Sequence, residues 1–123
     1  MASRLTKAVR SYDAVARYGG EEFLVVLPGC EARLGAERAE CIRMAINSCP
    51  VQTPSGMVPV SMSIGIAGAD QWKHLSGEQL IHEADIALYR AKELGRNRAV
   101  LAKPTGLEEI HHLNSREGPV HAD

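Results

Sequence analysis

Apolar side chains return along much of the chain at the spacing of an α-helix. Over residues 31–48 they recur every three or four positions with charged residues between them, which predicts an amphipathic helix. The same period over residues 77–94 predicts a second helix. Its start carries a capping box, Ser76 with Gln79, and its end carries Gly95, a residue suited to a left-handed helix cap. These two stretches are the main helices that we expect.

The N-terminal residues predict a helix followed by a hairpin. Apolar side chains over residues 5–12 recur at helical spacing, and we expect the chain to begin inside a helix that ends at Asp13. Two β-prone segments follow within residues 14–27, with a Gly-Gly pair between them. Because paired glycines supply the positive φ angles of a two-residue turn, we expect the hairpin to reverse at Gly19 and Gly20.

Residues 58–67 alternate apolar and small side chains, which is the period of a β-strand. We therefore expect a buried strand whose small residues let a helix pack closely. Residues 51–53 are expected to pair with the start of this stretch across residues 54–56, and residues 99–102 to form a last short strand. The polar residues 104–123 show no period, and we expect a C-terminal tail there.

The composition is that of one ordinary soluble domain, which we assign to residues 1–103. The chain has 123 residues, with 45% hydrophobic and 24% charged residues, enough to bury a modest core. The net charge of -1 gives no electrostatic reason to expect a nucleic acid partner. The sequence contains neither an apolar run of about 18 residues nor a signal peptide core, so we expect a cytoplasmic protein without membrane contact.

Cysteine and histidine chemistry is not indicated. Cys30, Cys41 and Cys49 lie far apart without a C-x-x-C pair, so we expect reduced thiols rather than disulfides or a zinc site. The five histidines have no partners at metal-ligand spacing. We therefore do not expect metal binding by histidine.

Residues 17–23 place two adjacent carboxylates, Glu21 and Glu22, at the tip of the expected hairpin. Adjacent carboxylates repel each other unless solvent or a cation separates them. The pattern leaves two interpretations open, a solvated turn and a metal site.

Two pairs of charged residues stand at spacings that bring them to one face. Lys92 and Arg96, four apart at the end of the second main helix, can grip one anion or only complement the helix dipole. Arg10 and Asp13, three apart, are expected to form a surface ion pair worth at most about 1 kcal/mol. Arg17, on the hairpin arm, is equally open to interpretation as a solvated cation.

Residues 17–23, Arg-Tyr-Gly-Gly-Glu-Glu-Phe, resemble the signature of the GGDEF domain, the diguanylate cyclase family, in its GGEEF form. The resemblance covers residues 3–102. Four further features agree with the family in order and spacing: residues 10–13, residues 63–67, the Ala-Asp-x-Ala-Leu-Tyr-x-Ala-Lys run of residues 84–92, and Gly-Arg-Asn at residues 95–97.

The resemblance implies an α+β fold, the ferredoxin-like nucleotide-cyclase palm with an antiparallel sheet and packed helices. It implies an enzyme that condenses two GTP molecules into cyclic di-GMP and releases pyrophosphate. In this family the domain works as a homodimer in which each copy holds one GTP, with Mg²⁺ or Mn²⁺ as cofactor. Phosphoryl transfer of this kind depends mainly on positioning and charge neutralisation.

The resemblance also implies roles for the signature residues. Glu21 would be a metal ligand and a candidate base for the attacking hydroxyl, and Glu22 would assist at the metal. Gly19 and Gly20 would let the nucleotide phosphates lie against the turn. Lys92 and Arg96, at the end of the second main helix, would hold the β- and γ-phosphates of GTP.

Arg10 and Asp13 stand at the family's spacing for an inhibitory site that binds cyclic di-GMP, where an arginine can fork onto phosphate or guanine. A second arginine of that site is expected on the following helix. Residue counting places Cys41 there, with Arg38 and Arg43 nearby. The sequence therefore leaves the second arginine open.

The N-terminal part of the family pattern is missing from these residues. The family's first strand, which bears a metal-binding aspartate, and its first helix are not found, so we interpret the chain as an N-terminally truncated GGDEF domain. Loss of a central strand leaves sheet edges that invite pairing with another chain. We therefore expect little activity from the chain alone. The alternative is a remnant that binds cyclic di-GMP without turnover or self-associates through its edge strands.

Overall fold

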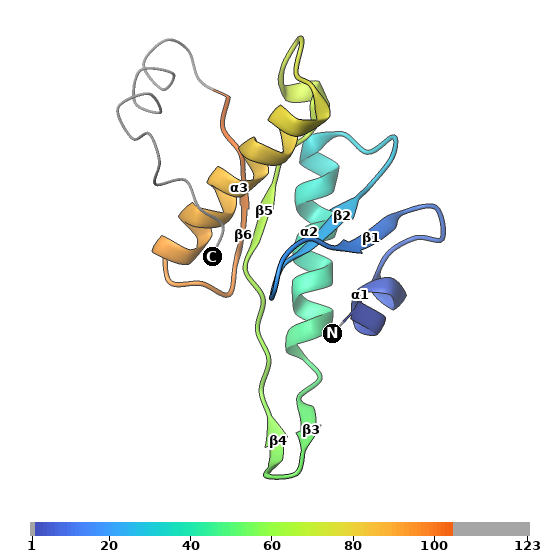
Figure 1. The fold of residues 1–123 in the computed structure, drawn as a ribbon, viewed down its shortest axis with the longest axis vertical. Helices are drawn as coiled ribbons and strands as arrows, with labels where there is room; N and C mark the ends of the chain where they lie inside the picture. The colour runs from blue at the N-terminus through green and yellow to red at the C-terminus, as the bar shows by residue number, and fades with distance from the viewer. Residues whose placement is uncertain (1, 105–123) are drawn as a thin grey trace.

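The structure is a computed structural model that describes residues 2–104 (Figure 1). The predicted tail therefore lies, apart from Pro104, outside the described residues. In chain order the elements are α1 (Ala2–Ala8), β1 (Ala14–Arg17), β2 (Phe23–Val26), α2 (Ala32–Asn47), β3 (Val51–Thr53), β4 (Gly56–Val58), β5 (Ile64–Ile66), the 3-10 turn η1 (Ala69–Gln71), α3 (Gly77–Glu93) and β6 (Ala99–Leu101). No helix in this part of the chain is long and apolar enough to cross a membrane.

The helices α2 and α3 confirm the two predicted main helices to within one residue at each end. The capping box at the start of α3 is present: the Ser76 hydroxyl accepts the Gln79 N–H at 3.1 Å, and the Gln79 side chain accepts the Ser76 N–H at 2.9 Å. The start of α2 is capped instead by a residue that is distant in sequence. The Ala32 N–H donates to Asp70 Oδ1, in η1, at 2.8 Å.

The first helix is shorter than predicted. α1 ends at Ala8, so the prediction that it continues to Asp13 is wrong. The Asp13 carboxylate accepts the N–H of Arg10 at 2.7 Å, and the Asp13 N–H donates to the Arg10 carbonyl at 3.0 Å. An aspartate side chain that accepts a backbone donor competes with helical hydrogen bonds. The chain therefore turns at residues 10–13 before it enters β1.

The strands form three separate pairs. β1 and β2 make the antiparallel signature hairpin, β3 and β4 make a second hairpin, and β5 pairs with β6 in parallel. Within residues 2–104 no ladder of hydrogen bonds joins one pair to another. The parallel pairing was not predicted, because it joins segments on either side of α3.

The single predicted strand over residues 58–67 is divided in the structure. Val58 closes β4, and β5 begins only at Ile64. Pro59 follows β4 directly and has no N–H to donate to a ladder, which explains the interruption. The alternation still places Val60 and Met62 against the buried cluster of Leu5, Ile42 and Ile46.

β5 and β6 lie between α2 and α3 (Figure 1). On the α3 side, a Cβ atom added to Gly65 would lie 2.2 Å from the Ala84 carbonyl oxygen and 2.3 Å from the Leu88 backbone nitrogen. Only glycine fits at such a distance, which confirms the prediction that a helix packs closely on the small residues. This contact fixes α3, and with it the end that carries Lys92, against the sheet.

Candidate functional site

The signature turn is wider than the sequence predicts. Residues 18–22 connect β1 to β2, and the N–H groups of Tyr18 and Gly19 both donate to the Glu22 carbonyl, at 2.9 and 3.3 Å. Neither Gly19 nor Gly20 has a positive φ angle. The expected two-residue Gly-Gly turn is therefore wrong, because the loop closes on the carbonyl of Glu22.

Arg17 orders this turn. Its Nη2 donates to the Gly20 carbonyl at 2.7 Å, and its guanidinium lies 5.7 Å from the centre of the Phe23 ring. The side chain therefore braces the loop, and Arg17 is more than a solvated cation. No separate signal in the sequence indicates this role, because the bond joins the Arg17 side chain to a backbone carbonyl of the turn.

The space above the signature glycines is open. A Cβ atom added to Gly20 would meet no other atom within 4 Å, and one added to Gly19 would lie 3.7 Å from Glu22 Oε1, an ordinary contact. Packing within the described chain therefore does not require glycine at either position. The backbone of the turn stays accessible to a bulky ligand.

The structure brings the signature turn to the end of α3. Lys92 Nζ lies 4.0 Å from Glu22 Oε2, and the two side chains are 18% and 23% exposed, whereas Glu21 is exposed. Burial raises the pKa of the nearby Asp85 carboxyl, while the charges of His82 and Lys92 oppose that rise. The Lys92 ammonium thus lies near the carboxylates of Glu22 and Asp85, and Glu22 comes from a distant part of the sequence.

The predicted left-handed cap after α3 is present. The Gly95 N–H donates to the Lys92 carbonyl at 3.3 Å and the Arg96 N–H to the Ala91 carbonyl at 2.9 Å, with Gly95 at φ +117. Arg96 and Asn97 also have positive φ angles, of 63 and 48. The Arg96 side chain is exposed beyond the helix end. No hydrogen bond or ion pair within residues 2–104 brings it to the hairpin. Because α3 ends at Glu93 and Arg96 has a positive φ angle, the prediction that Lys92 and Arg96 project from one helix face is wrong.

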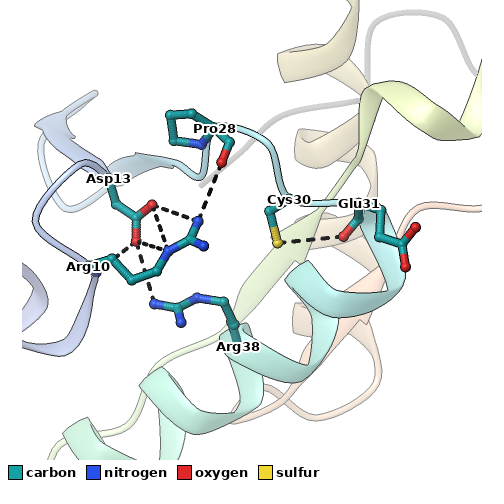
Figure 2. A network of polar contacts seen from close by, with 6 residues as sticks. All are labelled: Arg10, Asp13, Pro28, Cys30, Glu31 and Arg38. Atoms are coloured by element: carbon teal, nitrogen blue, oxygen red, sulfur yellow. Dashed lines mark hydrogen bonds and ion pairs between the residues drawn. The ribbon is translucent and has the colours of Figure 1, made fainter.

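A second polar cluster surrounds Asp13 (Figure 2). Arg10 Nη2 lies 3.0 Å from Asp13 Oδ1, Arg38 Nη2 lies 3.4 Å from Oδ2, and the Asp13 side chain is 0% exposed. The hydrogen bond from Arg10 lowers the pKa of Asp13 below its ordinary value. The predicted Arg10–Asp13 ion pair is therefore confirmed, but its carboxylate is enclosed rather than at the surface, and Arg38 also reaches it.

Arg38 is the α2 arginine that reaches this cluster. Its Nε is buried and has no hydrogen-bond partner in the described part of the chain. Cys41 is exposed, and Arg43 contacts Glu40 and Asn97 instead. The sequence named Arg38 only as a neighbour of the expected position, since residue counting cannot tell which side of a helix faces a turn.

The signature carboxylates suit a metal ion that arrives with phosphate. Among the described residues no group of three or more His, Cys, Asp or Glu side chains could hold a metal. Mg²⁺ is usually bound by one or two carboxylates together with substrate phosphates and water. Glu21 and Glu22, which are adjacent in an accessible turn, fit that donor set.

Comparison with known proteins identifies the family. The chain matches the model of the diguanylate cyclase GGDEF domain over residues 1–98. It is 38% identical over 102 residues to diguanylate cyclase DgcP of Pseudomonas aeruginosa, and 34% identical over 103 residues to diguanylate cyclase A of Treponema denticola. These matches cover 83% and 84% of this chain but only 15% and 28% of the two relatives.

The fold agrees with the same family. It resembles the crystal structure of the GGDEF domain of DgcB from Caulobacter crescentus in complex with c-di-GMP, with a TM-score of 0.74 and 31% identity. The match covers 83% of this chain and 58% of that chain. The predicted α+β palm fold is thereby confirmed, and the chain belongs to the GGDEF domain family of diguanylate cyclases.

Proposed function

We propose that this chain is the signature-bearing part of a diguanylate cyclase, which condenses two GTP molecules into cyclic di-GMP with Mg²⁺ as a homodimer. The approach of Glu22 to Lys92, at 4.0 Å, is the observation that carries the proposal. It joins a carboxylate of the signature turn to a cation at the end of α3. A nucleoside triphosphate with its metal needs charges of both signs at one place.

Glu21 and Glu22 are the residues that would hold Mg²⁺, or Mn²⁺ in its place, together with phosphate oxygens of GTP. When bound, the ion would supply charge neutralisation at the transferred phosphoryl group. Glu21 is exposed at the tip of the turn, so its carboxylate is accessible to take the proton of the attacking 3′-hydroxyl. Glu22 lies against Lys92 and has less freedom.

The phosphates would lie between the turn and the end of α3. The open space above Gly20 lets a phosphate approach the backbone, and the neighbouring Gly19 is also exposed. Lys92 and Arg96 would hold the β- and γ-phosphates. The Lys92 ammonium would act as a compact charge, and the Arg96 guanidinium could donate two hydrogen bonds at once. The half-buried position of Lys92 strengthens its attraction for phosphate, because screening by water is reduced there.

The 123 residues incubated alone with GTP and Mg²⁺ are expected to make little or no cyclic di-GMP. Among the described residues no group of three or more His, Cys, Asp or Glu side chains could hold a metal, and no hydrogen-bond ladder joins the β1–β2 pair to the β5–β6 pair. Product formation should be measured by chromatography beside a GGDEF protein of known activity. Robust product from the chain, absent in Glu21→Gln, would contradict this expectation.

A second candidate function is binding of cyclic di-GMP without turnover, at Arg10, Asp13 and Arg38. The observation that favours it is the arginine pair at Asp13, where the buried Nε of Arg38 has no hydrogen-bond partner in the described chain. Two guanidinium groups held by one carboxylate present donors for a phosphate or a guanine edge. This site and the signature turn share no residue, so both functions are compatible with one chain.

Titration with labelled cyclic di-GMP tests this site. Arg10→Ala and Arg38→Ala are each expected to weaken binding about tenfold or more, because each removes a charge-assisted hydrogen bond. Arg33→Ala, which removes an exposed arginine of the same helix, is the matched control and should bind like the wild type. Circular dichroism verifies that the variants fold. Absence of binding by the wild type, or equal binding by all variants, would exclude the site.

A further inference from the structure

Three consecutive residues after α3 lie in the left-handed region of backbone conformation. Gly95 adopts it freely, but Arg96 and Asn97 are not glycine, and their φ angles are 63 and 48. Arginine adopts such angles rarely, and asparagine only somewhat more often. A conformation of this kind persists only where surrounding contacts hold it.

Contacts from outside the turn supply that restraint. The Asn97 N–H donates to the Ser63 hydroxyl at 3.1 Å, and Arg98 Nε donates to the Arg96 carbonyl at 3.0 Å. Arg43, on α2, donates from Nη1 to Asn97 Oδ1 at 2.8 Å and to the Asn97 carbonyl at 3.5 Å. Of these, only the bond from Arg43 Nη1 to Oδ1 holds the turn through the Asn97 side chain.

The Arg43 guanidinium is itself held in place. Its Nε lies 3.1 and 3.0 Å from the two carboxylate oxygens of Glu40, its Nη2 also donates to Glu40, and the side chain is only 16% exposed. The hydrogen bond from Arg43 lowers the pKa of Glu40, so both partners stay charged. The fork on Glu40 leaves Nη1 free to point at Asn97, which makes Arg43 a rigid link from α2 to the turn.

We propose that Arg43 is a positioning residue for nucleotide binding: through Asn97 it holds residues 95–97 in the conformation from which Arg96 reaches the GTP phosphates. The proposal rests on the phosphate role proposed above for Arg96. Arg43 does not itself touch the nucleotide. Its removal loosens the turn, so that Arg96 must be ordered again each time GTP binds.

A double-mutant cycle separates this role from a general effect on the fold. Binding of GTP with Mg²⁺ is measured for the wild type, Arg96→Ala, Arg43→Ala and the double variant. Arg96→Ala is expected to weaken binding about tenfold, and Arg43→Ala about three- to tenfold. In the Arg96→Ala background, Arg43→Ala should have no further effect, because Arg43 acts only through Arg96. Arg33→Ala is the matched control on α2 and should leave binding unchanged.

The turn can also be observed without nucleotide. Residues with positive φ angles give strong NMR cross-peaks between their own amide and Hα protons, and these are expected at Arg96 and Asn97 in the wild type. They should weaken in Arg43→Ala and be partly retained in Arg43→Lys, which keeps the charge but not the fork. Arg43→Lys also provides a variant that folds if the alanine variant does not.

The other outcomes of the double-mutant cycle would contradict either the role of Arg43 or the phosphate role of Arg96. Weak binding by Arg96→Ala with normal binding by Arg43→Ala would overturn the inference and leave the proposed function intact. Equal loss on removing Arg43 with or without Arg96 would show a structural role only. If the wild type binds no GTP, or Arg96→Ala binds as the wild type does, the phosphate role of Arg96 is wrong and the inference falls with it.

Discussion

Lys92→Ala is expected to weaken binding of GTP with Mg²⁺ by about 10- to 100-fold, the loss typical of a charge-assisted hydrogen bond. Lys92 is only 18% exposed and lies 4.0 Å from Glu22. Because water screens charges weakly at such an enclosed place, losing the Lys92 ammonium removes a strong attraction for phosphate. The same change removes the cation that lies 4.0 Å from Glu22 at the proposed phosphate site. Isothermal titration calorimetry of the purified chain measures the effect directly.

Lys73→Ala is the matched control for this prediction. Lys73 is an exposed lysine just before the start of α3, at the opposite end of the helix from Lys92, and its removal changes the net charge by the same amount. GTP binding should be unaffected by it. Equal weakening by both variants would mean that Lys92 acts only through net charge, and the proposed phosphate role would be wrong.

Gly65→Ala is expected to lower the free energy of unfolding by about 3 kcal/mol, at the upper end of overpacking effects. The added Cβ would approach backbone atoms of Ala84 and Leu88 to 2.2 and 2.3 Å, and backbone cannot rotate aside as a side chain does. α3 must therefore move away from β5. Urea denaturation followed by circular dichroism measures the change.

Gly77→Ala provides the same chemical change in an open place. A Cβ at Gly77 meets nothing within 4 Å, and alanine favours the helix that begins there, so this variant should be as stable as the wild type or slightly more so. If Gly65→Ala unfolds at the wild-type urea concentration, the close approach of α3 to β5 is not present in solution.

The helices were predictable because their signals are local. A repeated apolar spacing and a capping box gave α2 and α3 to within one residue at each end. The family signature likewise lies within seven consecutive residues. Pro59 was a local signal that the alternation of residues 58–67 concealed, and it divides that stretch in the structure.

Other features depend on residues that are distant in sequence. The parallel pairing of β5 with β6, the capping of α2 by Asp70, and the contact of Lys92 with Glu22 join separate segments. No pattern in one segment encodes its partner. The burial of Asp13 has the same origin, since Arg38 on α2 completes the cluster around that carboxylate.

The residues of the candidate site were more predictable from the sequence than their geometry. Glu21, Glu22 and Lys92 were assigned by resemblance, and the fold places Lys92 beside Glu22. The turn that carries the carboxylates is shaped by Arg17 and the Glu22 carbonyl rather than by glycines at positive φ. Backbone conformation in a loop follows from such contacts, which composition alone does not specify.

Paramagnetic broadening by Mn²⁺ tests the central claim most directly, namely that the signature turn and the end of α3 form one site for GTP and its metal. In NMR spectra of the chain with GTP, a small amount of Mn²⁺ should broaden the amide signals of residues 19–22 and of residues 92–96 together. Signals of β3 and β4 should be unchanged, and broadening should be slight without GTP. Broadening confined to other residues, or none with GTP present, would contradict the account.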